Sequence, residues 1–379
     1  MEPSITLYSG ILLLGAAHGA FLALALLHVS TGNTVALRLL ALLTLTFAVD
    51  LGINFLSVSG YLVLHPRLAF IESAGMFLYG PLIYFYVLAM TAREQWHFSP
   101  RQWLHFLPFV VGIALLVPFY SLSNESLIGM IYAGRDVAAD LGSWAIGGLV
   151  VEVLPRLLIG AYLALGMRRL IQHGRDIRQQ FSLIENISLN WLRNLLIALG
   201  ALYVLYFVAL AFGGRGPVEN VLNIAMVVVV YTLGYMGLRQ PAIFTQRDEA
   251  APAKPKYQRS ALDDESSRML LKELQELMAN EQPYLDSKLT LAQLADQLKI
   301  SSNYLSQIIN QQTGSNFFDY INSHRVEAAK DILADPARAR VGVLTIAMDS
   351  GFNSKSAFYT AFKHHTSLTP SQYRQGKLS

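Results

Sequence analysis

The sequence has 379 residues, of which 53% are hydrophobic and 15% charged, and its mean hydropathy is +0.37. Soluble domains usually carry about 25% charged residues, so the composition excludes an entirely soluble protein and places much of the chain in lipid. The absence of cysteine excludes disulfides and thiolate metal sites, and a net charge of +3 is too small to indicate any partner.

Seven apolar stretches precede Arg239, and each is close to the ~20 residues that a helix needs to cross a bilayer. The N-terminus has neither the basic region nor the cleavage site of a removable signal peptide. The sequence therefore predicts a polytopic transmembrane helix bundle over residues 1–239. The expected spans are 5–28, 35–57, 67–90, 103–121, 144–167, 191–212 and 218–238.

Arginines in the expected loops indicate an orientation, because cytoplasmic loops of membrane proteins carry an excess of Lys and Arg. The loops opposite the C-terminus hold Arg67, Arg135 and Arg215. The loops on the side of the C-terminus hold Arg93, Arg101, Arg168, Arg169, Arg175, Arg178, Arg239 and Arg247. This bias predicts a multi-pass protein of a bacterial inner membrane, with the N-terminus outside and the C-terminal domain in the cytoplasm.

Charged groups within membrane spans are costly and often functional, and the candidates among those in the expected spans are Asp50, Glu72, Glu152 and Arg156. They can form an ion pair that holds helices together, or a site that senses a stimulus. His364 and His365 are adjacent rather than at metal-ligand spacing, so we expect no metal site and no cofactor.

A polar segment rich in Pro, Ala and charge, 240–260, is predicted to be a linker. Residues 261–280 follow as an amphipathic connecting helix, with Leu270, Leu274 and Leu277 on one face. This face can pack onto the next domain or form a dimerising coil, which a single short apolar seam supports only weakly.

Residues 281–379 contain two similar pairs of short helices joined by a longer helix. In the first pair, Thr290 and Gln293 form a capping box, Lys299 lies in a tight turn, and Ser301 caps the second helix. In the second pair, a turn at Gly351 precedes a helix capped by Ser354. This spacing predicts two helix-turn-helix units on one connecting helix.

The outward faces of the second helix in each pair are polar, and such a helix can enter the major groove of DNA. Amide and hydroxyl groups can pair with base edges, and cationic groups can hold phosphates. The predicted DNA-binding residues are Ser302, Asn303, Ser306, Gln307, Lys355, Ser356, Tyr359, Thr360, Lys363 and Arg374.

Three stretches carry a resemblance to a known family: LTLAQLADQLKISSNYLSQIINQQTG, INSHRVEAAKDIL and GFNSKSAFYTAFKHHTSLTPSQYR. Over Pro283–Arg374 the chain resembles the double helix-turn-helix DNA-binding domain of AraC/XylS-type transcription regulators. The apolar half, with LYGPLIYFYVLAMT and HFLPF, is similar to the seven-helix region of membrane-bound members. The resemblance implies sequence-specific promoter binding and assigns base contacts to the outward residues of both second helices. One departure is Lys299, where family members usually have glycine.

We therefore predict an all-α, membrane-tethered, one-component transcription regulator. Its expected partners are double-stranded promoter DNA, the lipid bilayer, a second copy of the chain as a homodimer, and an unidentified small-molecule or membrane stimulus. No nucleophile–base pair, phosphate loop or HExxH motif is present, so no enzyme is predicted. The alternative is a transporter-like or receptor-like membrane protein whose helical tail binds another protein.

Overall fold

The structure is a computed structural model that describes residues 3–30, 32–92, 96–133, 145–185, 187–212, 215–248 and 264–378. Regular structure in these ranges is helical, as the sequence predicts, and the one strand-like feature described is an isolated antiparallel bridge between Phe181 and Thr290. The chain forms two compact units. The bundle unit comprises Met1–Ile171 and Asn190–Thr245, and the C-terminal unit comprises Gln172–Leu189 and Gln246–Ser379.

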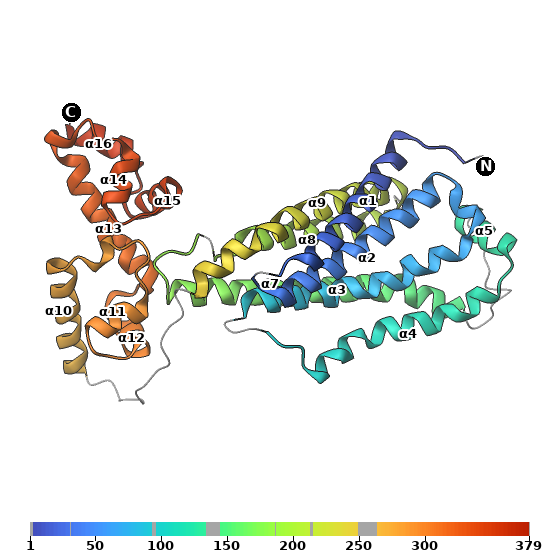
Figure 1. The fold of residues 1–379 in the computed structure, drawn as a ribbon, viewed down its shortest axis with the longest axis horizontal. Coiled ribbons are helices and arrows are strands. Elements are labelled where there is room, and N and C mark those ends of the chain that lie inside the picture. Colours follow the sequence, from blue (N-terminus) through green and yellow to red (C-terminus); the bar gives the residue numbers. More distant parts are fainter. Residues whose placement is uncertain are drawn as a thin grey trace. The chain divides into compact units, whose positions relative to one another are not determined.

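The bundle unit is built from long apolar helices, coloured blue to yellow in Figure 1. Helix α7 crosses from this unit into the C-terminal unit at its last turns. The helices are α1 (Leu7–His28), α2 (Thr34–Val58), α3 (Ala69–Thr91), α4 (Leu107–Leu116), α5 (Asn124–Ala133), α7 (Ala145–Arg178), α8 (Asn190–Ala211) and α9 (Arg215–Asp248).

Seven helical stretches among the described residues are long and apolar enough to cross a membrane, which confirms the predicted number of spans. They have 20–29 residues and mean hydropathies of 1.4–2.1. The fourth, Pro100–Ser121, is not a continuous α-helix, because 3-10 turns flank α4 on both sides. Pro108 and Pro118 each lie in the first turn of a new helical element, where a proline's missing N–H is tolerated.

Close packing of the bundle depends on small residues. Helix α1 packs along α2, and α2 packs along α3. At Gly15 of α1, an added Cβ would come within 2.7 Å of the Val227 side chain on α9, and at Gly19 within 3.0 Å of Ala48 on α2. These glycines let α1 approach both neighbours more closely than larger residues would allow.

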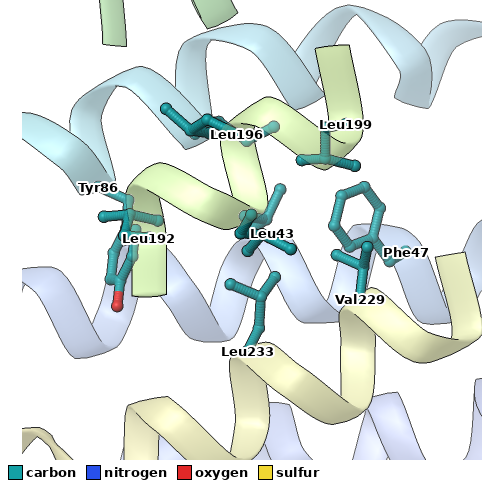
Figure 2. A pocket seen from close by; sticks show the side chains of 10 residues that line it. Leu43, Phe47, Tyr86, Leu192, Leu196, Leu199, Val229 and Leu233 are labelled. Atoms are coloured by element: carbon teal, nitrogen blue, oxygen red, sulfur yellow. The ribbon is translucent and has the colours of Figure 1, made fainter. Parts of the chain in front are cut away.

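A small pocket between α2, α3, α8 and α9 has an apolar lining (Figure 2). Phe47 and Leu43 of α2 face Leu196 of α8 and Leu233 of α9 across it. Its lining side chains are aliphatic or aromatic, and the Tyr86 hydroxyl is the one polar side-chain group among them. The pocket therefore has the character of a packing gap between helices.

In the described part of the C-terminal unit, the helices that follow the bundle surround two hydrophobic cores. These helices are α10 (Asp264–Asn280), α11 (Leu291–Gln297), α12 (Ser302–Thr313), α13 (Phe317–Ala334), α14 (Val343–Asp349), α15 (Lys355–Thr366) and α16 (Pro370–Leu378). The first core gathers side chains from α10, α11, α12 and the start of α13, including Phe317 and Ile321. The second gathers side chains from the rest of α13 and from α14 and α15, including Val326 and Leu333. One helix, α13, thus belongs to both cores.

The predicted linker and connecting helix are described in part. Helix α9 continues to Asp248, so residues 240–248 are helical, whereas 249–263 lie outside the described residues. Helix α10 buries Leu274 and Met278 in the first core, with Leu271 and Leu277 packed beside them. Its apolar face is therefore used within the C-terminal unit, as expected for a helix packed onto the next domain.

Candidate nucleic-acid interface

The first helix-turn-helix unit begins with the predicted capping box. The Thr290 backbone N–H donates to Gln293 Oε1 at 2.8 Å, and the Gln293 N–H donates to Thr290 Oγ1 at 3.3 Å. Ser301 Oγ then accepts from the Tyr304 N–H at 3.2 Å and starts α12. These bonds satisfy N–H groups that lack partners within a helix, and they fix where both helices begin.

The turn between α11 and α12 has a left-handed residue at Lys299, with φ of 56°. A side chain in this conformation is strained, because Cβ crowds the following carbonyl, and only glycine adopts it freely. The equivalent turn of the second unit has Gly351, with φ of 84°. The departure from glycine noted in the sequence therefore falls on a position whose backbone favours glycine.

We expect Lys299→Gly to raise the stability of the C-terminal unit by about 0.5–1 kcal/mol, because relief of strain exceeds the added entropy of the unfolded chain. The measurement is the opening free energy of amides in α11 and α12, by hydrogen exchange of the full chain. A slower-exchanging wild type would contradict the strain at this turn.

Helix α12 presents the face predicted from the sequence. Leu305, Ile308 and Ile309 are buried in the unit. Asn303 and Gln307 are exposed on the other side, and Ser302 and Ser306 are half-buried beside them. The four predicted residues of this helix therefore lie on one polar surface that carries amide and hydroxyl groups and no formal charge.

Helix α15 repeats the arrangement with added positive charge. Ser354 Oγ accepts from the Ala357 N–H at 3.0 Å, and Phe358, Ala361 and Phe362 are buried. The Lys355 ammonium lies 5.5 Å from the centre of the Tyr359 ring, a cation–π contact that orients both side chains. The solvent-exposed residues of this predicted face are Lys355, Ser356, Thr360 and Lys363.

Arg374 differs from the other predicted contacts because its guanidinium is engaged within the unit. It donates to the carbonyl oxygens of Val341 at 2.8 Å and Ala339 at 3.3 Å. These bonds attach α16 to the segment before α14. A phosphate contact by Arg374 stays a prediction, and the structure gives the residue a packing role as well.

Arg325 on α13 is a buried structural residue that the sequence does not single out. Its side chain is 2% exposed, and its guanidinium donates to Tyr284 O at 2.7 Å and Asp286 O at 2.8 Å. Burial lowers its pKa to about 10, with Asp286 acting in the opposite sense, so the group stays charged at neutral pH. It joins α13 to the 3-10 turn Pro283–Leu285. A lone arginine on a predicted helix gives no signal of burial.

The predicted residues Asp50, Glu72, Glu152 and Arg156 lie in the bundle unit, and Arg156 interacts with each of the other three. Arg156 of α7 interacts electrostatically with Asp50 of α2 and with Glu72 of α3. It also donates to the backbone carbonyl of Glu152 and lies 5.3 Å from the centre of the Tyr206 ring. These interactions link α2, α3, α7 and α8, and a sensing role for the same residues stays a prediction.

Two amides next to this group link further helices. Asn223 Nδ2 of α9 donates to Asn54 Oδ1 of α2 at 3.1 Å and to the Tyr8 hydroxyl of α1 at 3.2 Å. Asn54 Nδ2 in turn donates to Asp50 O at 3.1 Å.

No set of three or more His, Cys, Asp or Glu side chains in the described part of the chain is arranged to hold a metal ion.

Two helix-turn-helix units that share one connecting helix and present polar second helices define a class of DNA-binding domain. A family model described as a helix-turn-helix domain matches residues 294–376. This C-terminal segment of the chain is a helix-turn-helix domain of the AraC type, and its homologues are helix-turn-helix transcription regulators.

Two curated relatives illustrate the similarity. The melibiose operon regulatory protein of Escherichia coli (strain K12) is 30% identical over 90 residues, which are 24% of this chain and 29% of that protein. The uncharacterized HTH-type transcriptional regulator YtdP of Bacillus subtilis (strain 168) is 36% identical over 94 residues, 25% of this chain and 12% of that protein. The chain thus spans less than a third of the length of either relative.

Among solved structures, the C-terminal domain of the two-component response regulator yesN from Fusobacterium nucleatum is 32% identical. The match covers 29% of this chain and 98% of that one, with a TM-score of 0.24. The C-terminal domain of AraT, a response regulator from Geobacillus stearothermophilus, is 29% identical, covering 29% and 84% of the two chains with a TM-score of 0.24.

Proposed function

We propose that this protein is a membrane-anchored transcription regulator that binds specific promoter DNA through α12 and α15. The observation that carries the proposal is the pair of exposed polar helix faces, which α13 joins in one unit of AraC type. Each second helix offers groups that suit base edges, and α15 adds lysines that suit phosphates. Promoter DNA is therefore the proposed partner.

The anchoring half of the proposal rests on the bundle unit. Its candidate spans expose large apolar side chains, among them Leu14 and Phe21 of α1 and Val204 of α8, each at about two-thirds of full exposure. Large exposed apolar surfaces are rare on soluble monomers and are covered by lipid in membrane helices. We propose a multi-pass protein of a bacterial inner membrane.

The proposed orientation puts the N-terminus outside and the C-terminal unit in the cytoplasm, where the DNA is. It follows the bias of loop arginines, including Arg168 and Arg175 near the end of α7. Two of the arginines that indicate this orientation, Arg93 and Arg135, lie outside the described residues. Reporter fusions at the C-terminus test the orientation, and a periplasmic signal would reject it.

The test of function is footprinting with the full chain in lipid nanodiscs, on duplexes selected from random sequence. We expect the double variant Gln307→Ala, Lys355→Ala to bind the selected duplexes about 30-fold more weakly or worse, because each base contact contributes about 1–3 kcal/mol. Lys355→Ala alone should also lower the slope of affinity against salt by about one unit.

The matched control is Lys272→Ala, which removes an exposed lysine of α10 that lies 3.8 Å from Glu276. This variant should bind DNA like the wild type, since its ion pair is exposed on α10 and neither residue belongs to the predicted DNA-contacting faces of α12 and α15. Unchanged protection by the double variant would reject the assigned faces. Recovery of a bound protein in place of DNA would favour the alternative of a protein-binding tail.

A further inference from the structure

The segment between α7 and α8, residues 179–189, belongs to the C-terminal unit and contacts the helix-turn-helix domain within it; we call it the docking segment. Phe181 pairs with Thr290 in the antiparallel bridge: the Ser182 N–H donates to Leu289 O at 3.3 Å, and the Leu291 N–H donates to Gln180 O at 3.0 Å. Thr290 is also the N-cap of α11. The docking segment is therefore joined by backbone hydrogen bonds to the start of the first helix-turn-helix unit.

The buried Arg325 holds the docking segment from a second side. Its guanidinium donates to Ser182 O at 3.3 Å and to Ser182 Oγ at 3.1 Å. Ser182 is 3% exposed, and its hydroxyl donates to Leu289 O at 2.6 Å. The contact between the docking segment and the first helix-turn-helix unit is therefore built around two buried polar residues, Ser182 and Arg325.

The docking segment also contacts the start of α15, the second helix of the second helix-turn-helix unit, through Glu185. The Ser354 hydroxyl donates to Glu185 Oε1 at 2.8 Å, and Ser354 is the N-cap of α15. A helix N-terminus attracts anions, because its free N–H groups and the helix dipole are positive there. The Glu185 carboxylate therefore places a negative charge at the start of α15.

We propose that the docking segment holds the DNA-binding domain in a state of low DNA affinity, with Glu185 competing with a DNA phosphate at the start of α15. The inference rests on the proposed DNA binding and adds its regulation. The docking segment connects α7 and α8, which both contain candidate spans. A movement of these two helices is therefore transmitted directly to the segment and releases the domain.

A disulfide lock tests the docking, since the chain has no cysteine of its own. Phe181 and Thr290 form the non-hydrogen-bonded type of antiparallel pair, whose Cα atoms lie about 4.5 Å apart, within the range that a disulfide spans. The Phe181→Cys, Thr290→Cys variant of the full chain is oxidised in nanodiscs. Proteolysis and mass spectrometry then show whether the two cysteines are joined.

We expect the oxidised variant to bind the selected duplex at least about fivefold more weakly than the same protein after reduction, the lower range of allosteric coupling. The reduced form is the matched control, because it carries both substitutions, including loss of the Thr290 cap. Equal or tighter binding by the oxidised form, or failure of the cysteines to join, would overturn the inference. Absence of binding in both forms would reject the proposed function itself.

The charge of Glu185 is tested separately by Glu185→Gln. Glutamine keeps an oxygen that accepts from Ser354 and removes the negative charge, so we expect DNA binding to become about two- to fivefold tighter. Glu281→Gln, which neutralises an exposed carboxylate after α10, is the control and should leave the affinity unchanged. An unchanged affinity for Glu185→Gln would overturn competition at the start of α15.

Discussion

Arg325→Met is expected to destabilise the C-terminal unit by about 3–5 kcal/mol, because several hydrogen bonds from a charged donor are lost and each contributes about 1.5–3 kcal/mol. Methionine fills part of the space but donates no hydrogen bond. The buried carbonyl of Tyr284 would then lack its present donor, which costs about 1–3 kcal/mol, and the partly buried carbonyl of Asp286 would lose its partner as well. Hydrogen exchange of α13 amides in the full chain measures the effect.

The matched control is Arg338→Met. Arg338 is about half exposed and lies 3.6 Å from Asp349, a surface ion pair that contributes at most about 1 kcal/mol. If the two methionine variants lost similar stability, the buried hydrogen bonds of Arg325 would stabilise the unit no more than the surface ion pair of Arg338 does.

Gly351→Ala is expected to destabilise the same unit by about 2–4 kcal/mol through two independent effects. A residue with a side chain is strained at φ of 84°. The added Cβ would also overlap the carbonyl oxygen of Tyr284 and lie 2.9 Å from Leu285 Cα, both in rigid backbone. The opening free energy from hydrogen exchange again reports the loss.

Gly314→Ala separates the two effects. Gly314, the C-cap of α12, has φ of 67°, but no atom lies within 4 Å of its added Cβ. It should therefore show the conformational strain alone, about 1 kcal/mol. Equal losses at Gly314 and Gly351 would show that packing against Tyr284 and Leu285 contributes nothing.

Much of the fold was predictable because its signals are local. Seven long apolar stretches are difficult to accommodate in a soluble fold, so they predict membrane-spanning helices. The described residues contain seven helical stretches of this kind, as predicted. The capping residues Thr290, Ser301 and Ser354 mark helix starts through a pattern that spans only four residues. All three act as N-caps in the structure. Helical periodicity likewise separates the buried Leu305 and Ile309 from the polar side of α12.

The missed features depend on contacts between distant parts of the chain. The bond from Ser354 to Glu185 joins residues 169 positions apart, and the bond from Ser182 to Leu289 joins residues 107 apart. Glu185 is in the short segment between α7 and α8, which lies outside every predicted span and motif. No local pattern states which surface such a loop covers, so neither the docking segment nor the burial of Arg325 could be inferred.

Helix α13 also limits the spacing of the DNA sites that we propose for this protein. Its first turns belong to the hydrophobic core that contains α12, and its last turns belong to the core that contains α15 (Figure 1). The single helix α13 therefore fixes the separation and the relative orientation of α12 and α15. Inserting one base pair between the two half-boxes of a site rotates one of them by about a tenth of a helical turn. If α12 and α15 each read one half of a site, as proposed, they do not follow that rotation, so we expect the DNA sites of this protein to keep a constant distance between their two halves.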